Sequence, residues 1–167
     1  FAELAHRDAL TGAMNRHAVQ TWLEQQARQV RWGHSTLSIL YMDLDNFKKI
    51  NDKFGHQMGD DILREFVMVV ASSIAPDDRL VRWGGEEFVV VMPNTDHENA
   101  LITAERLRSA LSLHGFVTEQ KEEVRVTCSF GVVTTEDNEM SFKSLCDQAD
   151  KLLYQAKANG RNCVKGR

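Results

Sequence analysis

The chain has 167 residues, of which 43% are hydrophobic and 26% are charged, a composition that fits one globular domain with a single core and excludes an intrinsically disordered chain. Its formal net charge of −4 provides no overall attraction to nucleic-acid backbones, so any phosphate binding must come from local groups or from a bound cation. Three widely spaced cysteines without a CxxC pair exclude a disulfide framework and a zinc site, and no apolar run approaches the roughly 18 residues that cross a bilayer.

The first seven residues differ from the rest of the chain. Phe1, Leu4 and Ala5 have helical spacing, and the sequence begins without an initiator Met. We therefore expect residues 1–7 to be the end of a linker helix that continues from a missing N-terminal region. Residues 8–167 are expected to form one domain.

The first long helix is indicated by a mostly apolar face. Val19, Trp22 and Leu23 have the spacing of such a face. Asn15 is a suitable N-cap for this helix, and Gly33 is a suitable stop.

A short strand and a short helix follow. The apolar run over residues 37–42 is too short for a typical helix and predicts a buried strand that ends on the DLD sequence of residues 43–45. Apolar residues at helical spacing predict a helix over residues 47–54. The glycine-bearing stretch 55–60 is predicted to break that helix as a loop close to the end of the strand.

The rest of the chain alternates between helix and strand signals. Gly84 and Gly85 separate two strand-like runs and predict a tight hairpin, in which glycine supplies the positive φ of the turn. The predicted elements are a helix over 62–74 that ends near Pro76, strands over 79–83 and 88–92, a helix over 100–111 behind a cap at 95–96, a strand over 124–130, a helix from Ser141 to Gly160 and a final strand at Val164.

This order of elements predicts the fold class. A hairpin within the sheet requires antiparallel pairing, so a purely parallel doubly wound sheet is disfavoured. We predict an α/β sandwich with a ferredoxin-like palm, in which helices flank a central, mostly antiparallel sheet.

Four carboxylates are predicted to lie close together. Asp43 and Asp45 end the buried strand, and Glu86 and Glu87 follow the hairpin glycines. Like charges at short distance raise one another's pKa, and Mg²⁺ prefers carboxylate oxygens and leaves coordination positions for substrate phosphates. Spacing alone also allows a simpler interpretation, in which the aspartates cap the next helix and the glutamates are solvated turn residues.

Several basic residues could meet phosphate groups near these acids. Lys48 follows the acidic strand end within one helical step, and Lys157 and Arg161 stand at i, i+4 near a helix end. Lys48 can equally lie on a solvated helix face, and cations at a helix end are favoured by the helix dipole without any ligand. His56 can be an ordinary loop residue.

Five motifs in register resemble the GGDEF family of bacterial diguanylate cyclases. The signature GG(D/E)EF is matched by GGEEF at residues 84–88. The other four motifs are DALTGAMNR at 8–16, DLDNFKKIND at 43–52, GHQMGD at 55–60 and YQAKANGRN at 154–162. Together they cover nearly the whole chain, and the resemblance implies a palm domain related to those of nucleotide cyclases and polymerases, with residues 8–167 as the catalytic domain.

The resemblance also implies roles for individual residues. Asp43 and Glu86 are expected to bind Mg²⁺, with Mn²⁺ as a substitute, and the resemblance offers the carbonyl of Leu44 as a candidate third ligand. Glu86 is also expected to assist deprotonation of a ribose 3′-hydroxyl, mainly as an electrostatic organiser because a metal-bound carboxylate is a weak base. The resemblance further implies that Lys48 is catalytic and that Asn51 and Asp60 bind the guanine edge. It implies that His56 lies beside that edge, and that Lys157 and Arg161 contact the triphosphate.

Asp60 is well suited to guanine. Its two oxygens can accept hydrogen bonds from the N1 and N2 hydrogens, which adenine does not offer, so ATP would leave buried polar groups unpaired. A simpler role for Asp60 is N-capping of the following helix.

The activity implied by the resemblance is condensation of two GTP into cyclic di-GMP with release of two pyrophosphates. Each domain presents one nucleotide, so catalysis is expected to require a homodimer. We expect a cytoplasmic signalling domain that contacts neither nucleic acid nor membrane directly. Its parent chain is expected to carry an N-terminal sensor and can be tethered to the inner membrane.

One departure from the family pattern concerns product binding. Many members carry an RxxD motif five residues before the signature, but the corresponding residues 75–78 here are APDD, so Ala75 replaces the arginine. Arg79 lies outside the register. Because phosphates favour bidentate guanidinium contacts, we predict weak or absent product inhibition through this primary site.

Two other functions remain open from the sequence. A cyclase-like domain can sense GTP without turnover, although every expected catalytic position is filled here. A polymerase-like nucleotidyltransferase is the second alternative, and the net negative charge argues against it.

Overall fold

The computed structural model describes residues 6–29, 36–117, 121–135 and 141–167. The predicted stop at Gly33 and residues 1–5 of the linker helix predicted over residues 1–7 lie outside these ranges, and Arg7, at the end of that prediction, forms an isolated β-bridge with Met14. The elements in chain order are α2 (Arg16–Gln29), β1 (Leu37–Leu44), α3 (Phe47–Phe54), α4 (His56–Ala71), β2 (Arg79–Arg82), β3 (Glu87–Pro93), α5 (His97–Leu113), β4 (Gly115–Val117), β5 (Glu123–Arg125), β6 (Cys128–Thr135), α6 (Phe142–Ala158) and β7 (Val164–Gly166).

The central sheet has the strand order β2-β3-β1-β6-β7. β1 pairs antiparallel with both β3 and β6, β2 pairs antiparallel with β3, and β7 is parallel to β6. The predicted mostly antiparallel α/β sandwich is therefore confirmed. β1 lies in the middle of the sheet and is paired along its length on both sides.

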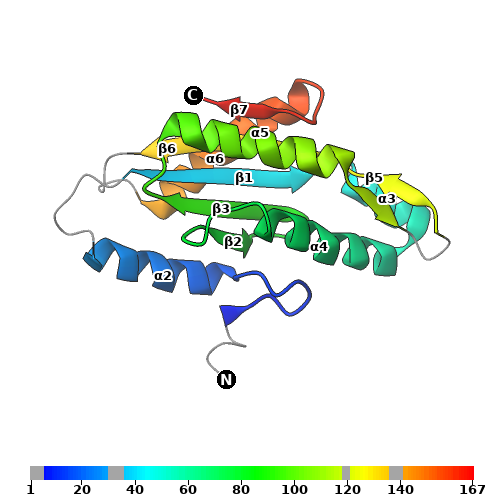
Figure 1. Ribbon diagram of the computed structural model, residues 1–167, viewed down its shortest axis with the longest axis horizontal. Helices are drawn as coiled ribbons and strands as arrows, with labels where there is room; N and C mark the ends of the chain where they lie inside the picture. The colour runs from blue at the N-terminus through cyan, green and yellow to red at the C-terminus, as the bar shows by residue number, and fades with distance from the viewer. Residues whose placement is uncertain (1–5, 30–35, 118–120, 136–140) are drawn as a thin grey trace.

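Helices cover both faces of this sheet (Figure 1). Alternate residues of β1 serve two cores, because side chains of a strand point to opposite faces. Leu40 and Met42 pack with α4 and α5 on one face, whereas Ile39 and Tyr41 pack with α2 and α6 on the other. With both faces covered, β1 is an almost continuous apolar run that ends in acidic residues.

α6 lies unusually close to the sheet at Gly131 of β6. A Cβ atom at this position would stand 2.1 Å from the carbonyl oxygen of Ala149 in α6. The missing side chain therefore allows helix backbone and strand backbone to approach. This contact sets the distance between α6 and the sheet.

Several predicted helix ends are confirmed by their caps. The Asn15 side chain accepts a hydrogen bond from the Ala18 amide, Asp96 accepts from Asn99, and Ser141 accepts from Ser144. These bonds satisfy backbone N–H groups in the first turns of α2, α5 and α6.

The predicted loop over residues 55–60 was wrong. Only Gly55, with φ of 91°, breaks the chain, and α4 begins at His56. Gly59 therefore lies inside the helix, where a Cβ atom would stand 1.8 Å from Oδ1 of Asn51. Asp60 lies beyond the first turn of α4 and is not its N-cap, since Gly55 occupies that position.

Two further expectations were wrong in detail. The glycines with positive φ among the described residues are Gly12, Gly55 and Gly160, so the GGEEF hairpin turns without positive φ at its glycines. The strand predicted over residues 124–130 is two strands, because β5 forms a separate small sheet with β4 before β6 begins.

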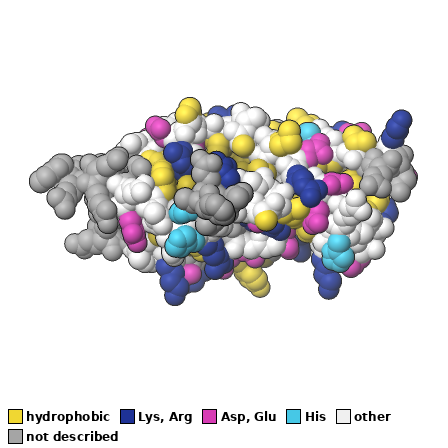
Figure 2. Space-filling view, turned by 90° about the horizontal axis from the view of Figure 1, so that it is seen from below, with side chains coloured by type: hydrophobic (Ala, Val, Ile, Leu, Met, Phe, Trp, Pro, Cys, Tyr) yellow, Lys and Arg dark blue, Asp and Glu magenta, His cyan; other side chains and the backbone are white. Residues whose placement is uncertain are grey.

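Within the described ranges, no helix combines the length and apolar character needed to cross a membrane. On the face seen in Figure 2, basic and acidic side chains are interspersed, so the described residues form no continuous basic stripe there. This distribution is unlike the basic track of a nucleic-acid-binding surface.

Candidate active site

The acidic ends of β1 and β3 lie side by side. The register pairs Asp43 of β1 with Glu87 of β3, and the Leu44 amide donates a hydrogen bond to the Glu86 carbonyl at 3.3 Å. Antiparallel pairing thus brings the aspartates of one motif to the glutamates of another, as predicted. All of these residues lie at one end of the sheet, next to the start of α3.

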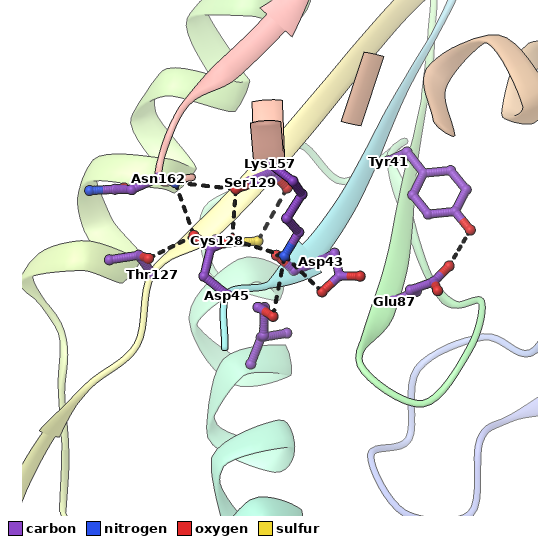
Figure 3. Close-up of polar contacts among 10 residues, drawn as sticks. Tyr41, Asp43, Asp45, Glu87, Thr127, Cys128, Ser129, Lys157 and Asn162 are labelled. Carbon is purple, nitrogen blue, oxygen red and sulfur yellow. Dashed lines mark hydrogen bonds and ion pairs between the residues drawn. The ribbon is translucent and has the colours of Figure 1, made fainter. Parts of the chain in front are cut away.

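Lys157 of α6 lies among these acids (Figure 3). Its Nζ donates to Oδ1 of Asp43 at 3.1 Å and to Oδ1 of Asp45 at 2.9 Å. The same ammonium group lies 3.4 Å from the Asp43 carbonyl oxygen and 3.5 Å from that of Leu44. Oxygen atoms from three consecutive residues therefore converge on one cation.

Asp45 anchors the surrounding structure. Its residue is 3% exposed, and its carboxylate accepts hydrogen bonds from Thr127 Oγ1 and Ser129 Oγ, each at 2.7 Å. Burial would raise the pKa of Asp45, but the hydrogen bonds from Thr127, Ser129 and Lys157 outweigh burial and hold the pKa below its ordinary value. Ser129 lies in β6, Thr127 immediately precedes that strand, and Lys157 lies in α6, so Asp45 ties both elements to the end of β1.

The turn after α6 also closes on Asp45. Gly160, Arg161 and Asn162 all have positive φ, at 107°, 65° and 47°. This left-handed turn directs the Asn162 amide to Oδ2 of Asp45 at 3.0 Å. Sequence reasoning missed Thr127, Ser129 and Asn162, because uncharged residues and a backbone amide carry no spacing signal.

Asp43 is the carboxylate that most needs a cation. Burial raises its pKa to about 6; Lys157 opposes that shift, and the neighbouring Glu86 and Glu87 add to it. Glu87 lies on the side of Asp43 away from Lys157 (Figure 3). Its Oε2 accepts a hydrogen bond from the Tyr41 hydroxyl. Glu86 is half-buried beside Leu44.

These groups fit a Mg²⁺ ion. The Asp43 carboxylate and the Leu44 carbonyl already converge on an ammonium group, which shows that a cation can reach both oxygens. Among the described residues no three His, Cys, Asp or Glu side chains form a closed metal cluster. Mg²⁺ does not need one, because it commonly binds one or two carboxylates and completes its shell with water and substrate phosphates.

The predicted nucleotide-binding residues surround this end of the sheet. Lys48 and Asn51 lie on α3, His56 begins α4, and Asp60 follows in α4. Lys48, His56 and Arg161 are exposed, whereas Asn51 and Asp60 are half-buried. The structure brings Asn51 against Gly59 of α4, and the Asn51 Oδ1 is buried without a hydrogen-bond partner among the described residues.

The motif at residues 8–16 contacts the GGEEF hairpin. Asp8 accepts two hydrogen bonds from Arg82, at 3.1 and 3.2 Å, and Arg82 also donates to the Gly85 carbonyl. Arg16 donates to the Trp83 carbonyl at 2.9 Å, and its guanidinium lies 4.1 Å from the centre of the Trp83 ring. Residues 8–16 therefore hold the GGEEF hairpin in place.

Residues 75–78, where the RxxD motif is absent, lie along a different surface. Asp78 accepts a hydrogen bond from the Ala75 amide at 2.9 Å, and both residues line a cavity of about 770 Å³. Arg79 donates to the carbonyls of Pro76 and Asp78 and lies 5.1 Å from the Trp22 ring centre. Because its guanidinium makes these contacts, Arg79 is poorly placed to replace the missing arginine.

The fold and the site define a palm-like α/β domain with carboxylates and a lysine at the end of its central strand. A comparison with protein families matches residues 5–163 to the family described as "Diguanylate cyclase, GGDEF domain". The chain belongs to the GGDEF family.

Two named relatives are similar to this chain over nearly all of its length. The chain is 44% identical over 166 residues to the response regulator PleD of Caulobacter vibrioides. The aligned region covers 99% of this chain and 37% of PleD. It is 42% identical over 158 residues to diguanylate cyclase DgcS of Shewanella oneidensis, covering 95% of this chain and 51% of DgcS. The chain thus spans only about a third to a half of these relatives.

Solved structures resemble the fold over most of its length. The GGDEF domain of DgcB from Caulobacter crescentus in complex with c-di-GMP is 31% identical, with a TM-score of 0.89 and coverage of 97% of this chain and 95% of that one. The active GGEEF domain of a diguanylate cyclase from Vibrio cholerae is 35% identical, with a TM-score of 0.73 and coverage of 86% and 88%.

We predict that Asp43→Asn raises the free energy of unfolding of the metal-free protein by about 1–2 kcal/mol near neutral pH. The folded-state pKa of about 6 exceeds the ordinary value of 3.8. The folded state therefore binds more protons than the unfolded state between these values, and stability falls as pH rises through this window. Asparagine removes that cost while keeping an oxygen for Lys157.

Urea denaturation in EDTA at about pH 7.5 and about pH 4 measures this effect. The gain should be largest at the higher pH and shrink at the lower one. An equal difference at both pH values, or a variant less stable than wild type at the higher pH, would contradict the prediction.

Proposed function

We propose that this domain is a diguanylate cyclase that condenses two GTP molecules into cyclic di-GMP. The observation that carries the proposal is the convergence of Asp43, the Leu44 carbonyl and Lys157 at the end of β1, with Glu86 beside them. Family membership and the named cyclases among its relatives support the same conclusion.

Asp43, the Leu44 carbonyl and Glu86 would hold Mg²⁺. When bound, the ion would neutralise phosphate charge and lower the pKa of a nearby hydroxyl. Lys157 would exchange its contact with the Leu44 carbonyl for the triphosphate and stay anchored by Asp45. Lys48 and Arg161, which are both exposed, would supply further positive charge to the phosphates.

The reaction is a nucleotidyl transfer. The 3′-oxygen of one GTP attacks the α-phosphorus of the other, the bond from the α-phosphorus to the bridging oxygen breaks, and pyrophosphate leaves. Repetition with exchanged roles closes the ring and releases a second pyrophosphate. Glu86 would help to hold the ion that lowers the pKa of the 3′-hydroxyl and would orient that hydroxyl, with water accepting the proton.

Guanine would bind between α3 and α4. The buried Oδ1 of Asn51 lacks a partner among the described residues, and a donor on the ligand would satisfy it. Asp60 follows Gly59, whose missing side chain lets the Asn51 side chain pack against α4 beside Asp60. Asp60 would accept the N1 and N2 hydrogens of guanine, and His56 would border the pocket.

A homodimer completes the site, because each domain would bind one nucleotide and two must meet for two phosphodiester bonds to form. We also propose that residues 1–7 end a linker from an N-terminal sensor in a cytoplasmic signalling protein. Control of dimerisation by that sensor would then control synthesis.

Incubation of the concentrated domain with GTP and Mg²⁺ should yield cyclic di-GMP and pyrophosphate, measured by chromatography. Glu86→Ala should reduce the rate by at least about 100-fold, because it removes a ligand of the ion that would stabilise charge on the reacting phosphate. ATP should give no cyclic product, and Asp60→Ala should narrow the difference in binding between GTP and ATP.

Failure to make product even when a fused coiled coil enforces dimerisation would refute the cyclase proposal and favour a GTP-binding module. Product formation by Glu86→Ala at the wild-type rate would remove Glu86 from the mechanism. An unchanged nucleotide preference in Asp60→Ala would remove Asp60 from guanine recognition.

We also propose that cyclic di-GMP inhibits this domain weakly, if at all, through the segment at residues 75–78. Ala75 has no cation, and Arg79 is engaged by backbone carbonyls. Calorimetric titration with cyclic di-GMP should show no tight binding at this site. Tight binding that is lost in Asp78→Ala would contradict this proposal.

A further inference from the structure

Two adjacent glutamates stand at the start of β3, where Glu86 immediately precedes the strand and Glu87 is its first residue. Both lie next to the Asp43 and Leu44 oxygens that would bind the metal. Glu87 is directly opposite Asp43 in the β1–β3 register. Side chains opposite each other in an antiparallel pair share a face, with Cβ atoms about 4.5–5.5 Å apart. By position alone, Glu87 therefore lies within reach of the Asp43 carboxylate.

Tyr41 holds Glu87 in a different direction. It lies two residues before Asp43 on the same face of β1 and is 5% exposed. Its hydroxyl donates a hydrogen bond to Oε2 of Glu87. In Figure 3 the Tyr41 and Glu87 side chains meet on one side, apart from the oxygens of Asp43 and Asp45 that surround Lys157.

Negative charge surrounds Glu87 on this face. Glu87 interacts electrostatically with Asp43 and with Asp150 of α6. Lys157 forms ion pairs with Asp43 and Asp45. Among the described residues, Tyr41 is the side chain that donates a hydrogen bond to Glu87. Without the Tyr41 hydroxyl, Glu87 would need another donor or cation, and its position opposite Asp43 makes a metal ion at Asp43 a candidate.

We propose that Tyr41 is a positioning residue that keeps Glu87 away from the metal, so that only Glu86 of the two glutamates serves as a ligand. The inference rests on the proposed function of this site. A third carboxylate on the ion would occupy a position that GTP phosphate needs, because Mg²⁺ accepts six ligands in near-octahedral geometry. The Tyr41–Glu87 hydrogen bond thus keeps the site open to substrate.

The test is binding of Mn²⁺ to the nucleotide-free domain, measured by electron paramagnetic resonance. Tyr41→Phe should bind Mn²⁺ about tenfold more tightly, a change of the size seen when a partner of a metal ligand is altered. Adding Glu87→Gln to Tyr41→Phe should return the affinity to the wild-type value. Tyr154→Phe is the matched control, because Tyr154 is 76% exposed and should change nothing.

Unchanged or weaker Mn²⁺ binding in Tyr41→Phe overturns the inference, as does tighter binding that persists in the double variant. If Tyr41→Phe does not fold, Glu87→Gln alone decides, because loss of a charge that is not a ligand should change Mn²⁺ affinity by less than about threefold. A larger loss would make Glu87 a ligand. Cyclic di-GMP synthesis by the wild type is scored separately, so failure of the cyclase proposal cannot be mistaken for failure of this one.

Discussion

The antiparallel register between β1 and β3 is the constraint on which the rest of the site depends. It places Asp43 opposite Glu87 and Leu44 beside Glu86 at a half-buried strand end. Crowded carboxylates there are costly unless a cation compensates them. Lys157 supplies that charge in the metal-free protein, and the same oxygens suit Mg²⁺.

Asp45 and the opening motif stabilise this arrangement from two sides. Asp45 gathers hydrogen bonds from β6 and from the turn after α6, which fixes the position of Lys157. Asp8 and Arg16 bind Arg82 and the Trp83 carbonyl, which fixes the hairpin. Motifs that are far apart in the sequence thus serve one site, some through side-chain chemistry and others through support of the backbone.

The sequence predicted the elements whose signals are local. The short helix over residues 47–54, the caps at Asp96 and Ser141 and the hairpin all follow from spacing and turn chemistry. The loop expected over residues 55–60 was wrong because glycine is a poor helix former, whereas the contact of Gly59 with Asn51 favours a helix there.

Longer-range features of the site could not be predicted from spacing. The proximity of the acidic residues could be predicted, since it requires only that the two strands pair. The partners of Asp45 could not, because the pairing of β1 with β6, which ends at Leu44 and Cys128, brings Thr127 and Ser129 to Asp45. The Tyr41–Glu87 contact likewise depends on which strands are neighbours and on the face that each side chain occupies.

The most direct test of this account is a crystal structure with Mn²⁺ and a non-hydrolysable GTP analogue, in which anomalous scattering locates the metal. We expect a peak bonded to the Asp43 and Glu86 carboxylates and the Leu44 carbonyl, with Lys157 turned toward phosphate. A metal held instead by Asp45 or Glu87, or no metal at this end of β1 with nucleotide bound, would contradict it.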